Sequence, residues 1–269
     1  MYFIEVPWQV ASAGIWYRVS ESSSMAKQLK YIDDIITSVI KELPKYDCFR
    51  ITFGANLWTW QPFYWAGFKA TPCYTMLIED ILPEQMIKSI TSSRRNIVRR
   101  KDDYRFVDDE LGPEDAFQFI ESCYKQRGKK LTYSKERFLK LLYSLREHDA
   151  VKIRSLYNGD EIAAVNILFG DKERNYNHFV VHSVKAQDSG TKIIFDSILC
   201  TMAEAKTFDF EGSMIQDNCR FYSSFNPKWE IKYVIENFSN RYIIMQSLRT
   251  IVIAIKTSIA SQFGRCKNV

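Results

Sequence analysis

The 269-residue sequence lacks several patterns that mark common classes of protein. Its six cysteines are scattered and none form a CxxC pair, so a metal cage is not expected. No stretch of 18 uncharged apolar residues occurs, which argues against a membrane-spanning helix. The opening "MYFIEVPWQVASAG" has neither the basic start nor the unbroken apolar run of a signal peptide. We therefore expect a cytoplasmic protein with reduced thiols.

The motifs of covalent acyl transfer are also missing. The sequence has no G-x-S-x-G nucleophile elbow, and no cysteine stands out beside a histidine. His178 and His182 are four residues apart on a predicted strand, hence on one face, but no acidic ligand lies at a fixed spacing from them. We therefore expect no metal site and no acyl-enzyme intermediate.

The composition that remains is that of a folded, mildly basic protein. Apolar residues make up 46% of the chain and aromatic residues 14%, which is enough for a substantial core. The 37 Lys and Arg residues exceed the 32 Asp and Glu residues, giving a net charge of +5. This excess suits anionic partners without requiring nucleic acid.

Hydrophobic periodicity predicts an α/β or α+β fold. From residue 104 onward, the order of strands and helices is β-α-α-β-β-β-α-β-α-β. The hairpin turns "NGD" and "GDKE" separate three of these strands, and a helix over 189–206 crosses over to the next strand. The order therefore predicts a mixed sheet flanked by helices.

Three segments resemble one family in the same order along the chain. They are "PFYWAGFKATPCYTMLIED" (62–80), "SRRNIVRRKDD" (93–103) and "KTFDFEGSMIQDNCRFYSSFNPK" (206–228). Together they resemble the Fem-like branch of the GNAT acyltransferase superfamily, which includes the peptidoglycan-bridge aminoacyltransferases. The resemblance implies two tandem GNAT-like units. We expect an abbreviated first unit over 1–103, an acyltransferase unit over 104–240 and an amphipathic C-terminal helix over 241–269.

The resemblance also implies a reaction. We expect a bacterial acyltransferase that forms an amide on an amine acceptor, with a cell-envelope precursor as a candidate acceptor. The implied donor is acyl-coenzyme A or an aminoacyl-tRNA, with no tightly bound cofactor. Two alternatives remain open: O-acylation of a saccharide, and a GNAT-shaped binding protein without catalytic activity.

The donor site is predicted at "QDSGTK" (187–192). GNAT enzymes bind the coenzyme A pyrophosphate at Q/R-x-x-G-x-G/A, and a glycine turn before a helix directs N–H groups at an anion. This sequence departs from the motif because Lys192 takes the last position and Asp188 adds a negative charge. An ordinary turn, with Gly190 at positive φ, is the competing interpretation. The candidate donor-binding residues are Gln187, Ser189, Gly190, Thr191 and Lys192.

The catalytic candidates lie in and after "FDFEGSM" (208–214). In a strand, Phe208 and Phe210 point to one face and the two acids to the other. Glu211, at the strand end, is the candidate base or ammonium ligand, whereas Asp209 is expected to be solvated or tied to Arg220. The resemblance implies a tyrosine as general acid, and Tyr222 is the nearest match, with core packing as the alternative.

Acceptor binding is predicted at aromatic and basic segments. The run "WTWQPFYWAGF" is either a core plug or a wall that stacks on a sugar or peptide, with Trp65 as the candidate. The helix of Arg94, Arg95, Arg99, Arg100 and Lys101 is either a solvated face or a site for phosphates, those of tRNA included. The candidate substrate-binding residues are Trp65, Arg95, Arg99 and Arg220.

The segment 242–263 is the most apolar stretch, but Arg249 and Lys256 interrupt it on one helix face. Packing against the core or a partner is favoured, and contact with a membrane surface is the alternative.

Overall fold

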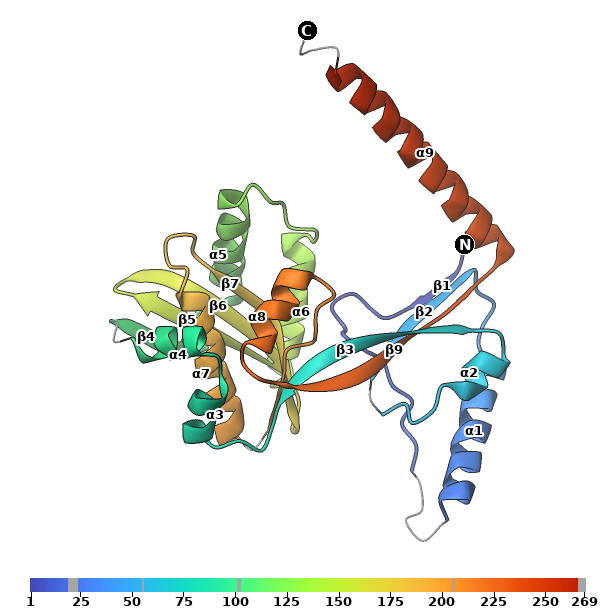
Figure 1. Cartoon of the computed structure of the whole chain (residues 1–269), viewed down its shortest axis with the longest axis horizontal. Coiled ribbons are helices and arrows are strands. Elements are labelled where there is room, and N and C mark those ends of the chain that lie inside the picture. The colour runs from blue at the N-terminus through green and yellow to red at the C-terminus, as the bar shows by residue number, and fades with distance from the viewer. Residues whose placement is uncertain (19–23, 55, 101–102, 205, 266–269) are drawn as a thin grey trace. The chain divides into compact units, whose positions relative to one another are not determined.

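The computed structural model describes residues 1–18, 24–54, 56–100, 103–204 and 206–265, and side chains as far as residue 254. The chain divides into two compact units (Figure 1). The first comprises residues 1–73 and 231–269, and the second comprises residues 74–230. Each unit is described separately below.

The second unit contains a mixed sheet with the strand order β3-β8-β7-β6-β5-β4. Neighbouring strands are antiparallel except β7 and β8, which are parallel and are joined by the crossover helix α7. The strands are β3 (Lys69–Ile78), β4 (Tyr104–Asp108), β5 (Val151–Asn158), β6 (Glu161–Gly170), β7 (Arg174–His182) and β8 (Thr207–Asp209). The predicted mixed sheet is therefore confirmed.

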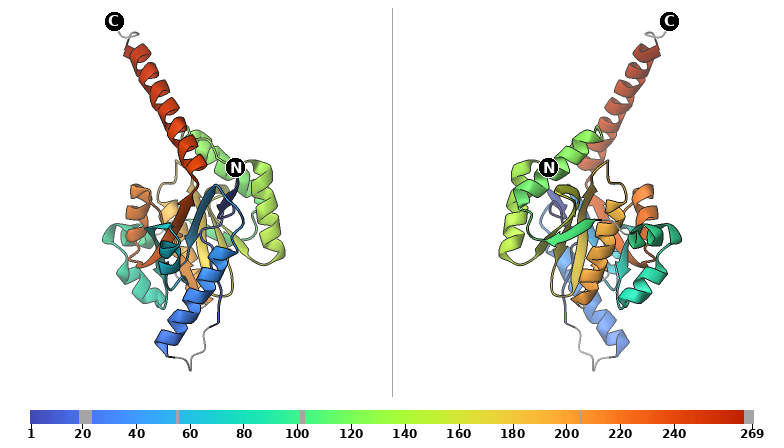
Figure 2. Two further views of the ribbon diagram at one scale, coloured as in Figure 1. Left: turned by 90° about the vertical axis from the view of Figure 1, so that its right-hand side faces the viewer. Right: turned by 90° about the vertical axis from the view of Figure 1, so that its left-hand side faces the viewer.

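Helices cover both faces of this sheet, which Figure 2 shows edge-on. They are α3 (Pro83–Ser89), α4 (Ser92–Arg99), α5 (Pro113–Gln126), α6 (Lys135–Glu147), α7 (Ser189–Ala203) and α8 (Gln216–Ser223). Successive residues of β6 point to opposite faces of the sheet. Ile167 packs in one core with Phe117 of α5 and Phe138 of α6. Leu168 packs in the other core with Ile194 of α7. This alternation is the reason that one strand can hold two helical layers.

A β-bulge in β7 separates the two histidines that the sequence placed on one face. Ile167 pairs with Phe179 and Leu168 with Asn177, so His178 is an extra residue. The His178 ring stacks on Phe169 at 4.1 Å, on the α5–α6 side. His182 instead lies against Gly190 of α7. The prediction of one shared face was wrong because the bulge shifts the alternation by one residue.

The first unit is built around a smaller sheet. In it, β1 (Phe3–Glu5) pairs in parallel with β2 (Cys48–Phe53), which pairs antiparallel with β9 (Lys228–Phe238). The helices are α1 (Met25–Lys41), α2 (Gln61–Trp65) and α9 (Asn240–Arg265). In α1, Ile32 and Ile36 are one helical turn apart and are buried in the same core as Phe49 and Phe63.

The two units divide at Cys73/Tyr74 and Glu230/Ile231, within β3 and β9. The sequence-based boundaries, at 103/104 and 240/241, differ because Met86 and Ile90 pack into the core that holds Phe208 and Phe210. An abbreviated GNAT-like first unit remains a prediction. Among the helices described, none is both long and apolar enough to cross a membrane.

Candidate functional site

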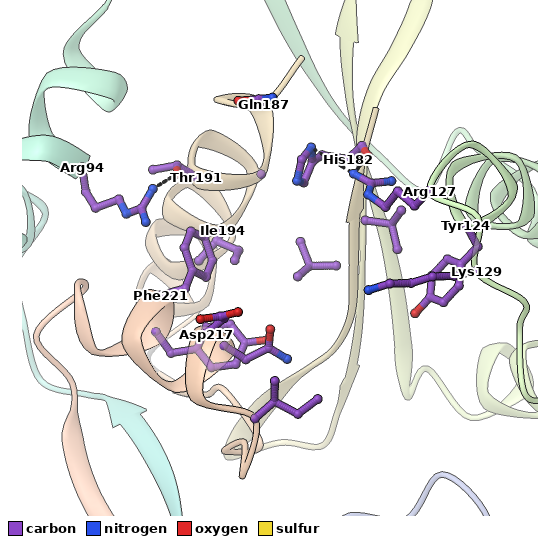
Figure 3. A pocket seen from close by; sticks show the side chains of 16 residues that line it. Arg94, Tyr124, Arg127, Lys129, His182, Gln187, Thr191, Ile194, Asp217 and Phe221 are labelled. Carbon is purple, nitrogen blue, oxygen red and sulfur yellow. Dashed lines mark hydrogen bonds between the residues drawn. The ribbon is translucent and has the colours of Figure 1, made fainter. Parts of the chain in front are cut away.

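A cavity of about 600 Å³ opens in the second unit where two parallel strands diverge (Figure 3). β7 pairs with β8 only from Arg174↔Thr207 to Tyr176↔Asp209, after which β8 ends and β7 continues to His182. The cavity walls come from β7, α7, α8, α4 and the end of α5, and include Val180, Val181, His182, Gly190, Thr191, Ile194, Asp217, Asn218, Phe221 and Tyr222. Ligands commonly bind at the carboxyl ends of diverging strands.

Three cations and one carboxylate line this cavity: Arg94, Arg127, Lys129 and Asp217. Arg94 donates to Thr191 Oγ1 and to Ser224 Oγ, each at 3.0 Å, and its guanidinium lies 4.5 Å from the centre of the Phe221 ring. Burial lowers the pKa of Arg94, and the Asp188 charge opposes this. The excess of fixed positive charge suits an anionic ligand.

His182 presents a ring nitrogen at the cavity wall. Its Nδ1 lies 2.9 Å from the Ser183 carbonyl oxygen, which can only accept, and 3.4 Å from Nη2 of Arg127, which can only donate. Arg127 also donates to the His182 carbonyl oxygen at 2.6 Å and holds the residue in place. A neutral imidazole has one nitrogen that accepts a proton, the role that a base needs.

The predicted donor-binding residues separate into two groups. Gln187, Gly190 and Thr191 line the cavity. Ser189 is buried and donates to the Ala163 carbonyl oxygen at 3.0 Å, so it joins α7 to the sheet. Lys192 does not line this cavity, because its Nζ donates to the Arg100 carbonyl oxygen at 2.8 Å.

The two departures from the pyrophosphate motif therefore have a structural explanation. Asp188 pairs with Arg100 at 2.5 Å, and Lys192 lies 5.3 Å from the centre of the Tyr104 ring. Both side chains contact residues outside the cavity lining, so neither fills it. The negative charge of Asp188 is offset by its own arginine.

Gly190 lies near the start of α7, as expected, but the prediction of positive φ was wrong. The residue is helical, and its importance is its lack of a side chain. A Cβ at this position would lie 3.0 Å from Cδ2 of His182. Glycine thus allows the helix to approach β7 closely.

The opening aromatic pair of "FDFEGSM" behaves as predicted, but Asp209 does not. Phe208 and Phe210 are buried, with ring centres 5.0 Å apart. Asp209 is also fully buried, accepts a hydrogen bond from Thr75 Oγ1 and pairs with Arg174 at 3.0 Å. It is therefore neither solvated nor tied to Arg220, because burial in the sheet requires a partner within reach.

Glu211 is half-buried and does not line the 600 Å³ cavity. Its carboxylate oxygens lie 2.8 and 3.0 Å from Nδ1 of His178. Its charge nevertheless acts on Tyr222, which does line the cavity. The catalytic role of Glu211 stays a prediction. Glu211 influences the cavity through the effect of its charge on the pKa of Tyr222.

Tyr222 combines a cavity position with a strongly shifted acidity. Its ring lies 4.8 Å from that of Phe210. Burial, followed by the Glu211 charge, raises the pKa of Tyr222 to about 12, against a small opposing effect of Asn177. The phenol therefore keeps its proton at neutral pH and can donate it.

The predicted acceptor residues do not meet at this cavity. Arg95 donates to the carbonyl oxygens of Ile87, Lys88 and Ile90, and so caps the end of α3. Arg99 is exposed, Trp65 is exposed in the first unit, and Arg220 lines a smaller cavity of about 370 Å³. Lys101 lies outside the described residues.

The sequence analysis did not predict that Arg127, Lys129, His182 and Asp217 line this cavity. One signal was present, since "KQRGKK" (125–130) places cations beside the glycine that ends a predicted helix. Within the described part of the chain, no three His, Cys, Asp or Glu side chains gather in a way that could hold a metal ion.

Comparisons with known proteins agree with this geometry. Residues 85–214 match the family described as acetyltransferase (GNAT) domain. The fold is similar to that of FemX, with a TM-score of 0.62 and 11% identity over 82% of this chain and 79% of that chain. L-PGS from Bacillus licheniformis gives a TM-score of 0.51 and 13% identity over 84% and 79% of the two chains. A conserved protein of unknown function from Bacteroides thetaiotaomicron gives 0.55 and 13% identity, over 78% and 75%.

The likeness to these structures shows a shared fold at low identity. The matched domain and the shared fold agree with the predicted resemblance to the Fem-like branch of the GNAT superfamily. A comparison with curated proteins gave no match.

Proposed function

We propose that the protein transfers an acyl group from acyl-coenzyme A to an amine acceptor, because residues 85–214 match a GNAT acetyltransferase domain. The observation that carries this proposal is the cationic cavity between β7 and α8. It adjoins the start of the 15-residue helix α7, whose dipole also favours an anion. The phosphates of the donor would bind near Arg94, Thr191 and Lys129.

In the proposed reaction, the acceptor nitrogen attacks the thioester carbonyl carbon of the bound donor. A C–N bond forms and the C–S bond breaks, so the leaving thiolate needs a proton and the attacking amine must lose one. Tyr222 is the proposed source of the first proton, because its phenol lines the cavity and is protonated at neutral pH. No covalent acyl-enzyme is required, because the cavity holds both reactants in position.

Two groups are candidates for the base that takes the proton from the amine. Glu211 is the candidate from the sequence and acts on the cavity through Tyr222. His182 is the candidate that the structure adds, because it lines the cavity and a neutral imidazole can accept a proton. Asp217, at the opposite wall, would attract the ammonium form of the acceptor.

Aminoacyl-tRNA is the alternative donor, which the resemblance of the sequence to the Fem-like branch implies. The same cations would then bind RNA phosphates. The acceptor class, whether a cell-envelope amine or a saccharide hydroxyl, remains to be chosen by experiment. A GNAT-shaped binding protein without catalysis would show ligand binding and no turnover.

Calorimetric titration of acetyl-coenzyme A into the whole chain tests the proposal. Lys129→Glu is expected to weaken binding by about tenfold or more, equivalent to about 1.4 kcal/mol, and more strongly at low salt. Lys130→Glu is the matched control, since Lys130 is the exposed neighbour and does not line the cavity.

Equal affinities for the two variants would contradict the placement of the donor. Failure of the unaltered protein to bind acetyl-coenzyme A, with binding of an aminoacyl-tRNA, would assign the donor to the tRNA class instead.

A further inference from the structure

Helix α9 carries an exposed apolar surface that its own unit leaves uncovered. Its first turn is anchored, because Tyr242 is buried and its ring lies 5.1 Å from that of Phe238 and 6.1 Å from that of Phe3. Beyond that turn, six large apolar side chains are between 48% and 62% exposed: Ile243, Ile244, Leu248, Ile251, Val252 and Ile253. A contiguous apolar surface of this kind marks a site of interaction.

Most of these residues share one face of the helix. Ile244, Leu248 and Ile251 follow one another at spacings of four and three, which is the spacing of a single stripe. Ser247 and Thr250 bond to carbonyl oxygens one turn earlier on the helix and lie between the apolar positions. The stripe therefore forms one apolar side of the helix, while Ile243 and Ile253 lie outside it.

The charges on this part of the chain have one sign only. Glu236 is the last acidic residue of the sequence, and residues 237–269 contain no Asp or Glu. The same segment contains five cations: Arg241, Arg249, Lys256, Arg265 and Lys267. A partner that binds α9 should therefore offer an apolar surface to the stripe and negative charge to the cations.

We propose that α9 binds the surface of a membrane that contains anionic lipids, with its apolar stripe at the boundary between headgroups and acyl chains. Such a surface offers α9 both apolar and charge complementarity. In this proposal the helix lies in the plane of the membrane surface.

A second copy of the chain fits the same surface less well. Pairing two α9 helices would bury the stripe but bring cations of both copies together, with no acid on either helix to pair with them. Charge complementarity thus selects the lipid surface over self-association. This inference is independent of the proposed acyltransferase activity, because binding to vesicles needs no turnover.

Sedimentation of the full chain with vesicles tests the proposal. We expect binding to phosphatidylcholine vesicles that contain phosphatidylglycerol to exceed binding to phosphatidylcholine alone by about tenfold or more. Added salt should reduce the difference. The double variant Leu248→Gln, Ile251→Gln should lose binding, and Arg249→Glu should weaken it on the anionic vesicles alone.

The control is Leu29→Gln with Val39→Gln, which changes two exposed apolar residues of α1 in the same unit. Circular dichroism should show all variants folded, because the altered side chains are exposed. Equal binding to both kinds of vesicle, or no binding to either, would overturn the proposal. So would a dimer, seen by light scattering, that the Leu248→Gln, Ile251→Gln variant converts to a monomer.

Discussion

The Glu211 carboxylate lies 2.8 Å from Nδ1 of His178, across the gap that opens where β8 ends. The chain turns sharply to make this contact, with φ of 59° at Glu211 and 71° at Gly212. A Cβ at Gly212 would collide with the Tyr74 carbonyl oxygen, so only glycine fits there. Non-glycine residues at positive φ are uncommon, and they cluster at functional sites.

Glu211→Gln is expected to slow acyl transfer by about a hundredfold, because glutamine keeps the size of the side chain but removes the charge. The measurement is kcat with acetyl-coenzyme A and an amine acceptor. His182→Gln is the comparison, since it alters the other candidate base without touching Glu211. Full activity in the Glu211 variant, together with a large loss in the His182 variant, would give the role of base to His182.

Asp209→Asn is expected to destabilise the fold by about 3 kcal/mol, because it leaves Arg174 without its fully buried partner. Glu230→Gln is the matched control, since Glu230 pairs with the same arginine at 3.2 Å but is partly exposed. Its loss should stay below about 1 kcal/mol. Urea unfolding compares the two, and equal losses would show that burial of Asp209 is not what makes its ion pair important.

The raised pKa of Tyr222 makes the free energy of unfolding depend on pH in the alkaline range. Its pKa is raised from 10.0 to about 12 in the folded state, so above pH 10 the unfolded chain loses this proton first. Stability from this group is fully present below pH 10 and falls as pH rises towards 12, by about 2 kcal/mol.

Unfolding of Tyr222→Phe over the same pH range isolates this contribution from those of other tyrosines. The variant should show a shallower decline than the unaltered protein. Identical declines would mean that Tyr222 titrates normally, and would remove one argument for its role as a proton donor. The same variant should lower kcat while leaving the affinity for the donor nearly unchanged.

Gly190→Ala is expected to impair donor binding more than folding. Alanine favours a helix interior over glycine by about 1 kcal/mol, which offsets the cost of a tight contact. The new methyl group would lie 3.0 Å from Cδ2 of His182 and would shift that ring at the cavity wall. Thermal unfolding and donor titration measure the two effects, and unchanged donor affinity would show that the position of His182 does not matter for binding.

Local patterns were enough to predict most elements of the fold. The first helix of the predicted order is observed as Pro113–Gln126, and its last strand is observed as Lys228–Phe238. Both signals lie within the segments themselves: Pro at a helix start, Gly after its end, and alternation along a strand. The mixed sheet followed from the order of these elements.

The candidate site was less predictable because it depends on contacts between distant segments. Nothing near Lys129 in the sequence shows that it faces the same cavity as Arg94. The bulge at His178 cannot be seen in the alternation of β7 alone, since it appears only in the pairing with β6. The sequence suggested that Arg95 could bind a substrate, because no residue pattern predicts its hydrogen bonds to three carbonyl oxygens at the end of α3.

Hydrogen–deuterium exchange with and without acetyl-coenzyme A tests most directly that the donor binds between β7 and α8. The account predicts that exchange becomes slower at residues 180–194 and 217–222 when the donor is bound. It predicts no change in exchange at the smaller cavity around Trp229. The Lys129→Glu variant should show less protection at the same donor concentration, and Lys130→Glu should match the unaltered protein. Protection that maps to other segments, or its absence at saturating donor, would contradict the account.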